Sequence, residues 1–274
     1  MNSVCVISAS FHYVFDDSAR GQDGAASRLI ELVNISIEQG ASVIDFGAVT
    51  FGTLPAGGSE RLARIVADIR DVYPEAIFQI TAHSFMHLAD LLRDYRAFAP
   101  DIVSVPLSAF FAKDATAILR SQEEQVPRLR SSLVLDLHDL SMLFQAVSLQ
   151  NDGLLKGPLR VNFCFGQEFG IPSDRHAFGF FVQTLRRLAP DAMWSGIGRG
   201  KSELELARWS MDTGGHCKVI VSAEANANDD SHDRDKATLS RVVKLCKEYG
   251  RRPASFAEAR RVLSLDDATQ VSLV

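Results

Sequence analysis

Residues 60–81 read ERLARIVADIRDVYPEAIFQIT, and this stretch contains the unit that decides the fold. Apolar residues from Leu62 to Ile69 recur at helical spacing, which predicts an amphipathic helix over Glu60–Val72. The next apolar run, Ile77–Thr81, is short and rich in β-formers, which predicts a buried strand. A helix that leads into a buried strand is the repeating unit of a parallel sheet.

The same unit recurs along the whole chain. Further helical patterns cover Ala26–Gln39 and Phe85–Phe98, and a short closing helix is expected within Pro253–Leu265. Together they predict an α/β fold, a (β/α)8 TIM barrel that spans residues 1–274 as a single domain. An open, doubly wound sheet is the alternative, and the lack of a dinucleotide fingerprint favours the closed barrel. The eight expected strands are Val4–Ser8, Ser42–Phe46, Ile77–Thr81, Ile102–Val105, Leu133–Leu137, Arg160–Phe165, Met193–Ile197 and Lys218–Ser222.

Composition excludes several classes of partner. A formal net charge of −5 and a pI near 5.8 supply no basic field for nucleic acid. No run of about 18 apolar residues is present, so we expect no membrane span, and the first residues lack the pattern of a secretory signal. The four cysteines are widely spaced and form no C-x-x-C pair, which indicates reduced core thiols in a cytoplasmic protein.

Polar side chains cluster at the predicted ends of the strands. In a barrel these ends meet at one mouth, where this fold carries its chemistry. Each residue also has an ordinary explanation, since a strand-end histidine is often a hydrogen-bonded structural residue and Asp45 is placed to cap a turn. The set is consistent with a divalent metal site or with acid–base chemistry, and spacing does not choose between them. It comprises Ser8, Ser10, His12, Asp45, Thr81, His83, Ser84, Asp136, His138, Asp139, Glu224 and Asn226.

Two turns that follow later strands suggest a phosphate site and a helix N-cap. Gly196-Ile197-Gly198-Arg199-Gly200 follows strand seven, where barrels often bind phosphate through backbone N–H groups. A tight turn between strand and helix is the equally weighted alternative. After strand six, Ser173 is the expected N-cap of the next helix.

The second half also resembles a known family. Gly170-Ile171-Pro172, Trp194 to Gly200, and Gly214-Gly215-His216-Cys217-Lys218-Val219 are similar to the G-I-P, W-S-x-I-G-x-G and G-G-H-V-R-V patterns of the β-keto acid cleavage enzymes of the 3-keto-5-aminohexanoate type. Residues 250–260 resemble the closing segment of that family. Residues 40–47 also resemble the strand-two signature of dihydropteroate synthases, which we treat as an analogy of fold only.

The resemblance implies a reaction and a set of ligands. A β-keto acid and acetyl-CoA would give acetoacetate and a new CoA thioester, in a homo-oligomer (dimer or tetramer). Family members hold a zinc-like divalent metal through an H-x-H pair after strand two and a glutamate after strand eight. Here the pair reads Asp45-Phe46-Gly47, the family's catalytic aspartate reads Ala225, and Lys218 replaces an arginine. The glutamate corresponds to Glu224, with two extra residues before it.

These observations lead to two hypotheses. The first is a divergent lyase or acyltransferase that acts on a small carboxylated keto acid with acetyl-CoA and has an altered or absent metal site. The second is a non-catalytic ligand-binding or assembly barrel that has lost the metal chemistry. A metal-free isomerase or aldolase ranks last, because no lysine clearly ends a strand to form a Schiff base. For the first hypothesis the expected catalytic residues are Glu224, His83, His138 and Lys218, the expected substrate-binding residues are Arg199, Ser84, Asn226 and His12, and the expected metal ligands are Asp45 and Glu224.

Overall fold

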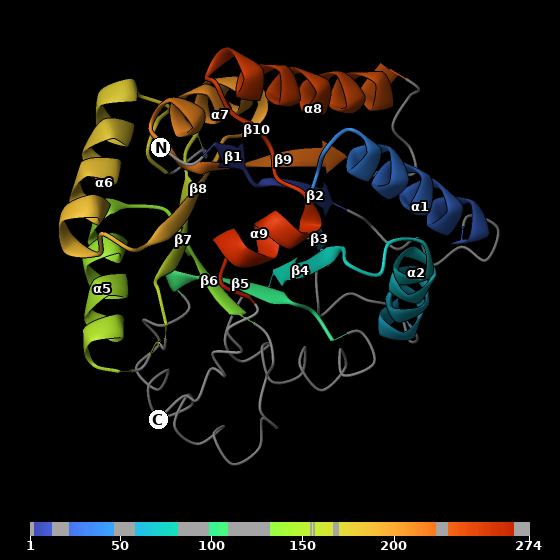
Figure 1. Cartoon of the computed structure of the whole chain (residues 1–274), viewed down its shortest axis with the longest axis horizontal. Helices are drawn as coiled ribbons and strands as arrows, with labels where there is room; N and C mark the ends of the chain where they lie inside the picture. Colours follow the sequence, from blue (N-terminus) through green and yellow to red (C-terminus); the bar gives the residue numbers. More distant parts are fainter. Residues whose placement is uncertain are drawn as a thin grey trace.

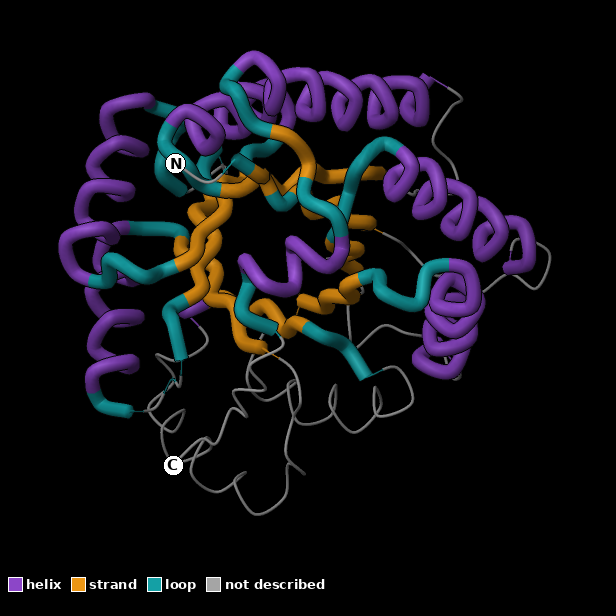
Figure 2. Tube along the Cα trace, in the orientation of Figure 1, coloured by secondary structure: helices purple, strands orange, loops and turns teal. Residues whose placement is uncertain are grey.

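Eight parallel strands close into a barrel, as predicted. The structure is a computed structural model that describes residues 3–12, 22–46, 58–81, 99–108, 132–153, 155, 157–166, 170–222 and 230–265. Each strand pairs in parallel with the next, and β9 pairs with β2 to complete the ring seen in Figure 2. The barrel strands are β2 (Ile7–His12), β3 (Val43–Phe46), β4 (Ile77–Thr81), β5 (Ile102–Pro106), β6 (Ser132–Leu137), β7 (Arg160–Cys164), β8 (Met193–Ile197) and β9 (His216–Ser222).

Helices surround the ring (Figure 1). Residues 82–98 and 109–131 lie outside the described part, so the helix expected over Phe85–Phe98 is untested. The described outer helices are α1 (Gln22–Glu38), α2 (Gly58–Val72), α5 (Leu140–Asn151), α6 (Arg175–Leu188), α7 (Glu203–Asp212) and α8 (Asp230–Glu248), with the short 3-10 turn η2 (Gly200–Ser202) before α7.

Successive side chains along each strand point alternately towards the outer helices and into the barrel interior. In β7, Phe163 packs against Phe178 and Phe181 of α6 with ring centroids 6.4 and 5.5 Å away. The residues on either side of it, Asn162 and Cys164, face the interior. The outward residues form the apolar core, and the inward residues near the strands' C-terminal ends are polar.

The N-terminal end of the barrel is closed by an apolar floor. Val6, Val43, Ile77 and further inward residues pack against Ala259 and Leu263. Ala259 belongs to α9 (Phe256–Val262), which lies across this end of the ring (Figure 1). A complete capping box between Ser255 and Glu258 starts this helix, so the expected closing helix is present and serves as the base of the barrel.

The expectation for the first strand was partly wrong. Val4–Cys5 forms a separate strand, β1, which pairs with β10 (Arg252–Pro253) beneath the barrel. The barrel strand begins at Ile7 and reaches His12, so Ser8 lies inside the barrel and Ser10 lies nearer the mouth. The apolar run Val4–Ile7 crosses both elements, which is why periodicity alone did not separate them.

A membrane-spanning element is not seen among the described residues, where every helix is too short or too polar to cross a bilayer.

Candidate active site at the barrel mouth

A buried lysine–aspartate pair lies at the mouth of the barrel. Lys218 Nζ is 2.5 Å from Asp45 Oδ2, and the two side chains are 7% and 0% exposed. Ser10 Oγ donates to the same oxygen at 2.7 Å, and Thr81 Oγ1 approaches Oδ1 at 3.4 Å. We call these four residues the Asp45 group. The Asp45 carboxylate is therefore held by three donors from three other strands, and one of these donors is the cation of Lys218.

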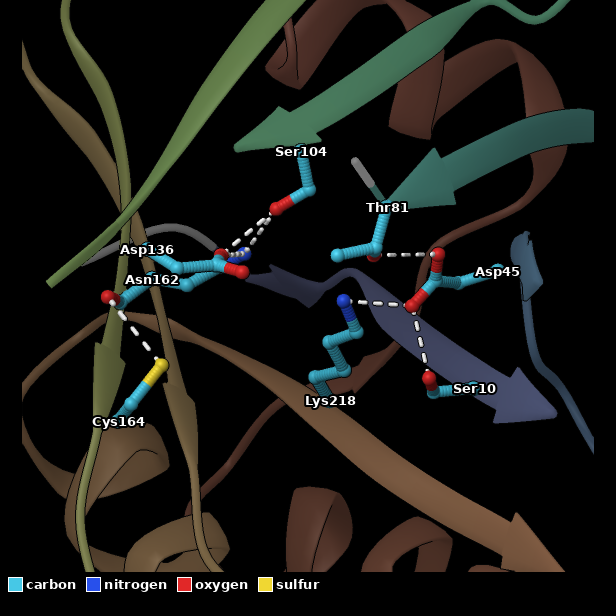
Figure 3. Close-up of polar contacts among 8 residues, drawn as sticks. All are labelled: Ser10, Asp45, Thr81, Ser104, Asp136, Asn162, Cys164 and Lys218. Atoms are coloured by element: carbon cyan, nitrogen blue, oxygen red, sulfur yellow. Dashed lines mark hydrogen bonds and ion pairs between the residues drawn. The ribbon is translucent and has the colours of Figure 1, made fainter. Parts of the chain in front are cut away.

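The register explains how the pair forms. Ser10 is directly opposite Asp45 on neighbouring strands, whereas Lys218 is opposite Ser8, one inward position deeper. Its long stem therefore runs up the barrel interior and brings the ammonium to the carboxylate (Figure 3). Lysine stems are commonly buried in this way while the charged end reaches a polar site.

A second polar group lies across the mouth. Ser104 Oγ and Asn162 Nδ2 each donate to Asp136 Oδ1 at 2.7 Å, and all three side chains are buried. We call these residues the Asp136 group. Among the described residues no donor engages Asp136 Oδ2. One oxygen of this carboxylate is thus fixed by neighbouring strands, and the other has no donor from the part of the chain that the structure describes.

Lys218 lies between the two carboxylates (Figure 3). Burial alone would lower the pKa of Lys218, but the charges of Asp45 and Asp136 and the hydrogen bond to Asp45 outweigh it and raise that pKa above its ordinary value. The side chain is therefore an ammonium at neutral pH. Among the described residues Asp45 is its only hydrogen-bonding partner, so two of its three N–H donors have no acceptor in this part of the chain.

The thiol of Cys164 borders the Asp136 group. Burial and the charge of Asp136 raise the pKa of Cys164 well above its usual value, against opposing effects of Lys218 and Arg199. The thiol is therefore protonated and unreactive. Arg199 is exposed and follows the C-terminal end of β8 by two residues, so this cationic residue lies at the same end of the barrel.

The other residues predicted at the mouth belong to neither the Asp45 group nor the Asp136 group. His138 is half-buried, and its Nδ1 has no hydrogen-bond partner among the described residues. Asp139 is the N-cap of α5 and accepts from the Met142 N–H at 3.0 Å, so the hypothesis of a mouth residue is replaced by a capping role. The predicted site residues His83, Ser84, Glu224 and Asn226, and the side chain of His12, lie outside the described residues.

The donor set does not fit the divalent metal that the resemblance implies. Asp45 stands at the first histidine position, and its carboxylate is already paired with an ammonium. A metal bound there would lie beside a like charge in a buried site. Within the described ranges, no three His, Cys, Asp or Glu residues are grouped so that they could hold a metal ion.

The glycine-rich turn after β8 has a packing explanation. A Cβ at Gly196 would lie 2.1 Å from Ser210 Oγ, and one at Gly198 would lie 2.6 Å from the Ser202 carbonyl oxygen. The two glycines therefore permit β8 to pack closely against η2 and α7, and phosphate binding is not needed to explain them. The N-cap expected at Ser173 was wrong by one residue, since Asp174 accepts from the Ala177 N–H at 2.8 Å.

Part of the site was not predicted from the sequence. Ser104 and Asn162 were not proposed as site residues, and Asp136 was included in the polar set at the strand ends without a role of its own. Strict alternation along Arg160–Cys164 would have found Asn162, because Val161 and Phe163 mark the outward positions. Ser104 follows from the same rule in β5, between Val103 and Val105.

Comparison with known proteins decides the family. Residues 26–265 match the beta-keto acid cleavage enzyme family. The chain belongs to this family. The match includes residues 40–47, so the first half follows the β-keto acid cleavage enzymes as the second half does.

Two curated relatives from the family cover most of the chain. A 3-oxoadipate:acetyl-CoA acetyltransferase of Cupriavidus necator is 31% identical, over 97% of this chain and 96% of the relative. A 3-keto-5-aminohexanoate cleavage enzyme of Acetoanaerobium sticklandii is 24% identical, over 83% of this chain and 85% of the relative. Among solved structures, the binary complex of ObcA with oxaloacetate has a TM-score of 0.62 at 16% identity, with 87% of this chain and 66% of that chain covered. This last likeness concerns the barrel fold alone.

Proposed function

We propose that this chain catalyses acyl exchange between a small carboxylated β-keto acid and acetyl-CoA. In this reaction the bond between C2 and C3 of the keto acid and the thioester bond of acetyl-CoA break. The acetyl group joins C2 to give acetoacetate, and the remaining acyl group joins the CoA sulfur. The observation that carries the proposal is the near full-length match, at 31% identity, to an acetyltransferase that is named for 3-oxoadipate and acetyl-CoA.

The charges at the mouth favour a dicarboxylic keto acid such as 3-oxoadipate. Lys218 supplies an ammonium inside the barrel, and Arg199 adds a guanidinium at its exposed rim. Two cations suit a substrate with two carboxylates, and a guanidinium is well shaped for carboxylate binding. A substrate that carries an amino group at its far end would instead meet a like charge.

Asp136 is the best-placed proton acceptor among the described residues. Carbon–carbon exchange at C2 needs a base that removes a proton there and later returns one. Ser104 and Asn162 fix one carboxylate oxygen of Asp136, and no described donor engages the other. This supports Asp136 in a role that the family assigns to an aspartate where this chain has Ala225. His138, His83 and Glu224 remain the alternative proton carriers, and Ser84, Asn226 and His12 remain predicted substrate contacts.

The experiment is a direct exchange assay. Purified protein is incubated with acetyl-CoA and a panel of β-keto acids that includes 3-oxoadipate and 3-keto-5-aminohexanoate, and mass spectrometry measures acetoacetate and new acyl-CoA species. We expect exchange that requires acetyl-CoA and prefers the dicarboxylic acid. The matched variant Arg199→Gln should raise KM for 3-oxoadipate more than for a monocarboxylic keto acid.

The alternative is a barrel that binds the keto acid without turning it over. The loss of the H-x-H pair and the replacement at Ala225 favour this reading. Calorimetric binding of 3-oxoadipate, with no acyl-CoA product from any substrate in the panel, would establish it and contradict exchange. A dimeric or tetrameric assembly and a cytoplasmic location are further predictions, to be tested by light scattering and by cell fractionation.

A further inference from the structure

The buried ammonium of Lys218 has a use that its pairing with Asp45 alone does not explain. Asp45 stands where the family pattern has the first histidine of its metal-binding pair. In this chain the same position holds a carboxylate that faces Lys218 at 2.5 Å. A positive charge is therefore present where the family's cation is expected, and it is attached to the protein.

The contacts of Asp45 leave it few functions other than holding this charge. One carboxylate oxygen accepts from both Lys218 and Ser10, and the other accepts from Thr81. A carboxylate with three donors on it is a poor additional ligand for a metal. It is instead a rigid support that orients the lysine, since its strand and both hydroxyl partners are buried.

The ammonium, in contrast, has bonding capacity to spare. Of its three N–H donors one is directed to Asp45, and no other described residue accepts from it. The Lys218 nitrogen lies between the carboxylates of Asp45 and Asp136 (Figure 3). A β-keto acid bound there would place an anionic carboxylate and a keto oxygen within reach of the same nitrogen.

We propose that the Lys218 ammonium replaces the divalent cation of the family, and that this chain binds and activates its β-keto acid without a metal. The inference rests on the proposed function. When the proton at C2 is removed, negative charge develops on the keto oxygen, and an oriented N–H donor in a buried site stabilises that charge. Asp45 is then a positioning residue, and Lys218 is the catalytic residue that contacts the substrate.

The proposal differs from imine chemistry at the same lysine. A Schiff base needs the neutral amine, whose nitrogen would attack the keto carbon and expel water. Asp45 and Asp136 hold the proton on Lys218, so the nitrogen acts as a hydrogen-bond donor. Borohydride would reduce an imine to a stable covalent adduct on Lys218, whereas an ammonium that only donates a hydrogen bond leaves no adduct. This difference provides one part of the test.

The experiment combines metal analysis with two matched variants. Wild-type protein is dialysed against a strong chelator, its zinc, manganese and iron contents are measured by mass spectrometry, and zinc binding is followed by calorimetry. We expect less than about 0.1 metal ion per chain, no saturable zinc binding, and exchange of 3-oxoadipate unchanged within about twofold by the chelator. Lys218→Met should lower kcat by about 10²–10³-fold, the range for loss of one oriented donor.

Because Lys218→Met leaves a buried unpaired carboxylate and is at risk of not folding, the neutral pair Asp45→Asn/Lys218→Met is measured beside it. The pair should fold and still lack activity. A stoichiometric metal whose removal abolishes turnover, full activity in the neutral pair, or a borohydride-trapped adduct of 3-oxoadipate on Lys218 would each overturn the proposal. If wild-type protein shows no exchange at all, the proposed function fails. Saturable zinc binding by that protein would then separately refute the replacement of the metal, and its absence would support it.

Discussion

The two ends of the barrel interior both bury positive charge, but they use it differently. At the floor, Arg160 donates to the carbonyl oxygens of Leu263 and Ser264 at 2.8 and 3.1 Å. Arg251 likewise donates to the carbonyl oxygens of Val4 and Gly215, each at 2.6 Å. At the mouth, Lys218 has one carboxylate partner among the described residues and retains free donors.

We interpret this difference as a separation between structural charge at the floor and functional charge at the mouth. Each of these arginines donates to backbone carbonyl oxygens that the strands leave without a partner. Arg160 does so at the C-terminal end of α9, and Arg251 at the start of β1. A buried lysine with free donors is costly unless a ligand completes its hydrogen bonds. We therefore expect variants at the floor to change folding and variants at the mouth to change turnover.

After replacement of Lys218 itself, the largest effect is expected from a substitution at the floor. Arg160→Met leaves the carbonyl oxygen of Leu263 in a buried site, and that of Ser264 in a half-buried one, without this donor, and a buried unsatisfied group costs about 1–3 kcal/mol. We expect the free energy of unfolding, measured in urea, to fall by about 3 kcal/mol, with kcat/KM of the folded protein unchanged within about twofold. A variant of normal stability and lost activity would break the distinction between the two ends.

At the mouth, Asp136→Asn should lower turnover and leave stability nearly unchanged. Asparagine keeps an oxygen that accepts from Ser104 and Asn162 but cannot take a proton, so we expect kcat to fall by about 10²-fold or more while the midpoint of unfolding hardly moves. Stopped assays of acetoacetate formation and urea titration measure the two quantities. Unchanged kcat would transfer the role of base to His138 or to a residue outside the described part.

His216 gives a pH test of the lower barrel. Burial, with a smaller contribution from Arg251, lowers the pKa of His216 to about 3, and its Nδ1 accepts from the Val6 N–H at 3.2 Å. The unfolded chain binds this proton near pH 6.5, so the folded state loses stability as the pH falls from about 6.5 towards 3. The slope approaches about 1.4 kcal/mol per pH unit, or about 2 kcal/mol by pH 5.

His216→Asn is the matched control, because the amide oxygen still accepts from Val6 and does not titrate. Its free energy of unfolding should depend less on pH between 5 and 6.5 than that of the wild type. An identical dependence in both proteins would assign the acid sensitivity to other groups.

The smallest expected effect concerns the cap of the floor helix. Ser255→Ala removes the side chain that accepts from the Glu258 N–H and begins α9. Loss of an N-cap costs about 1 kcal/mol, which calorimetry would show as a drop of a few degrees in Tm. Exchange activity should be unaffected, since α9 lies at the opposite end of the barrel from Lys218.

The sequence alone determined the order of the elements and the family. Helical spacing and short apolar runs are local signals, so seven of the eight strands lie close to their predicted positions, and the motif residues from Gly170 to Val219 indicated the β-keto acid cleavage enzymes correctly. The first strand was misplaced because one apolar run spans β1 and the start of β2. Asp45 and Lys218 were each selected as site residues, but for separate roles.

Only the tertiary structure decided that these two side chains form one pair. They lie on β3 and β9, which are separated along most of the chain, and β9 pairs with β2, the neighbour of β3, only when the barrel closes. The register places Lys218 one inward position deeper than Ser10, and the length of its stem then brings the ammonium to Asp45. Strand order can be inferred from local periodicity, whereas a contact across a closed sheet depends on register and closure, which no local pattern contains.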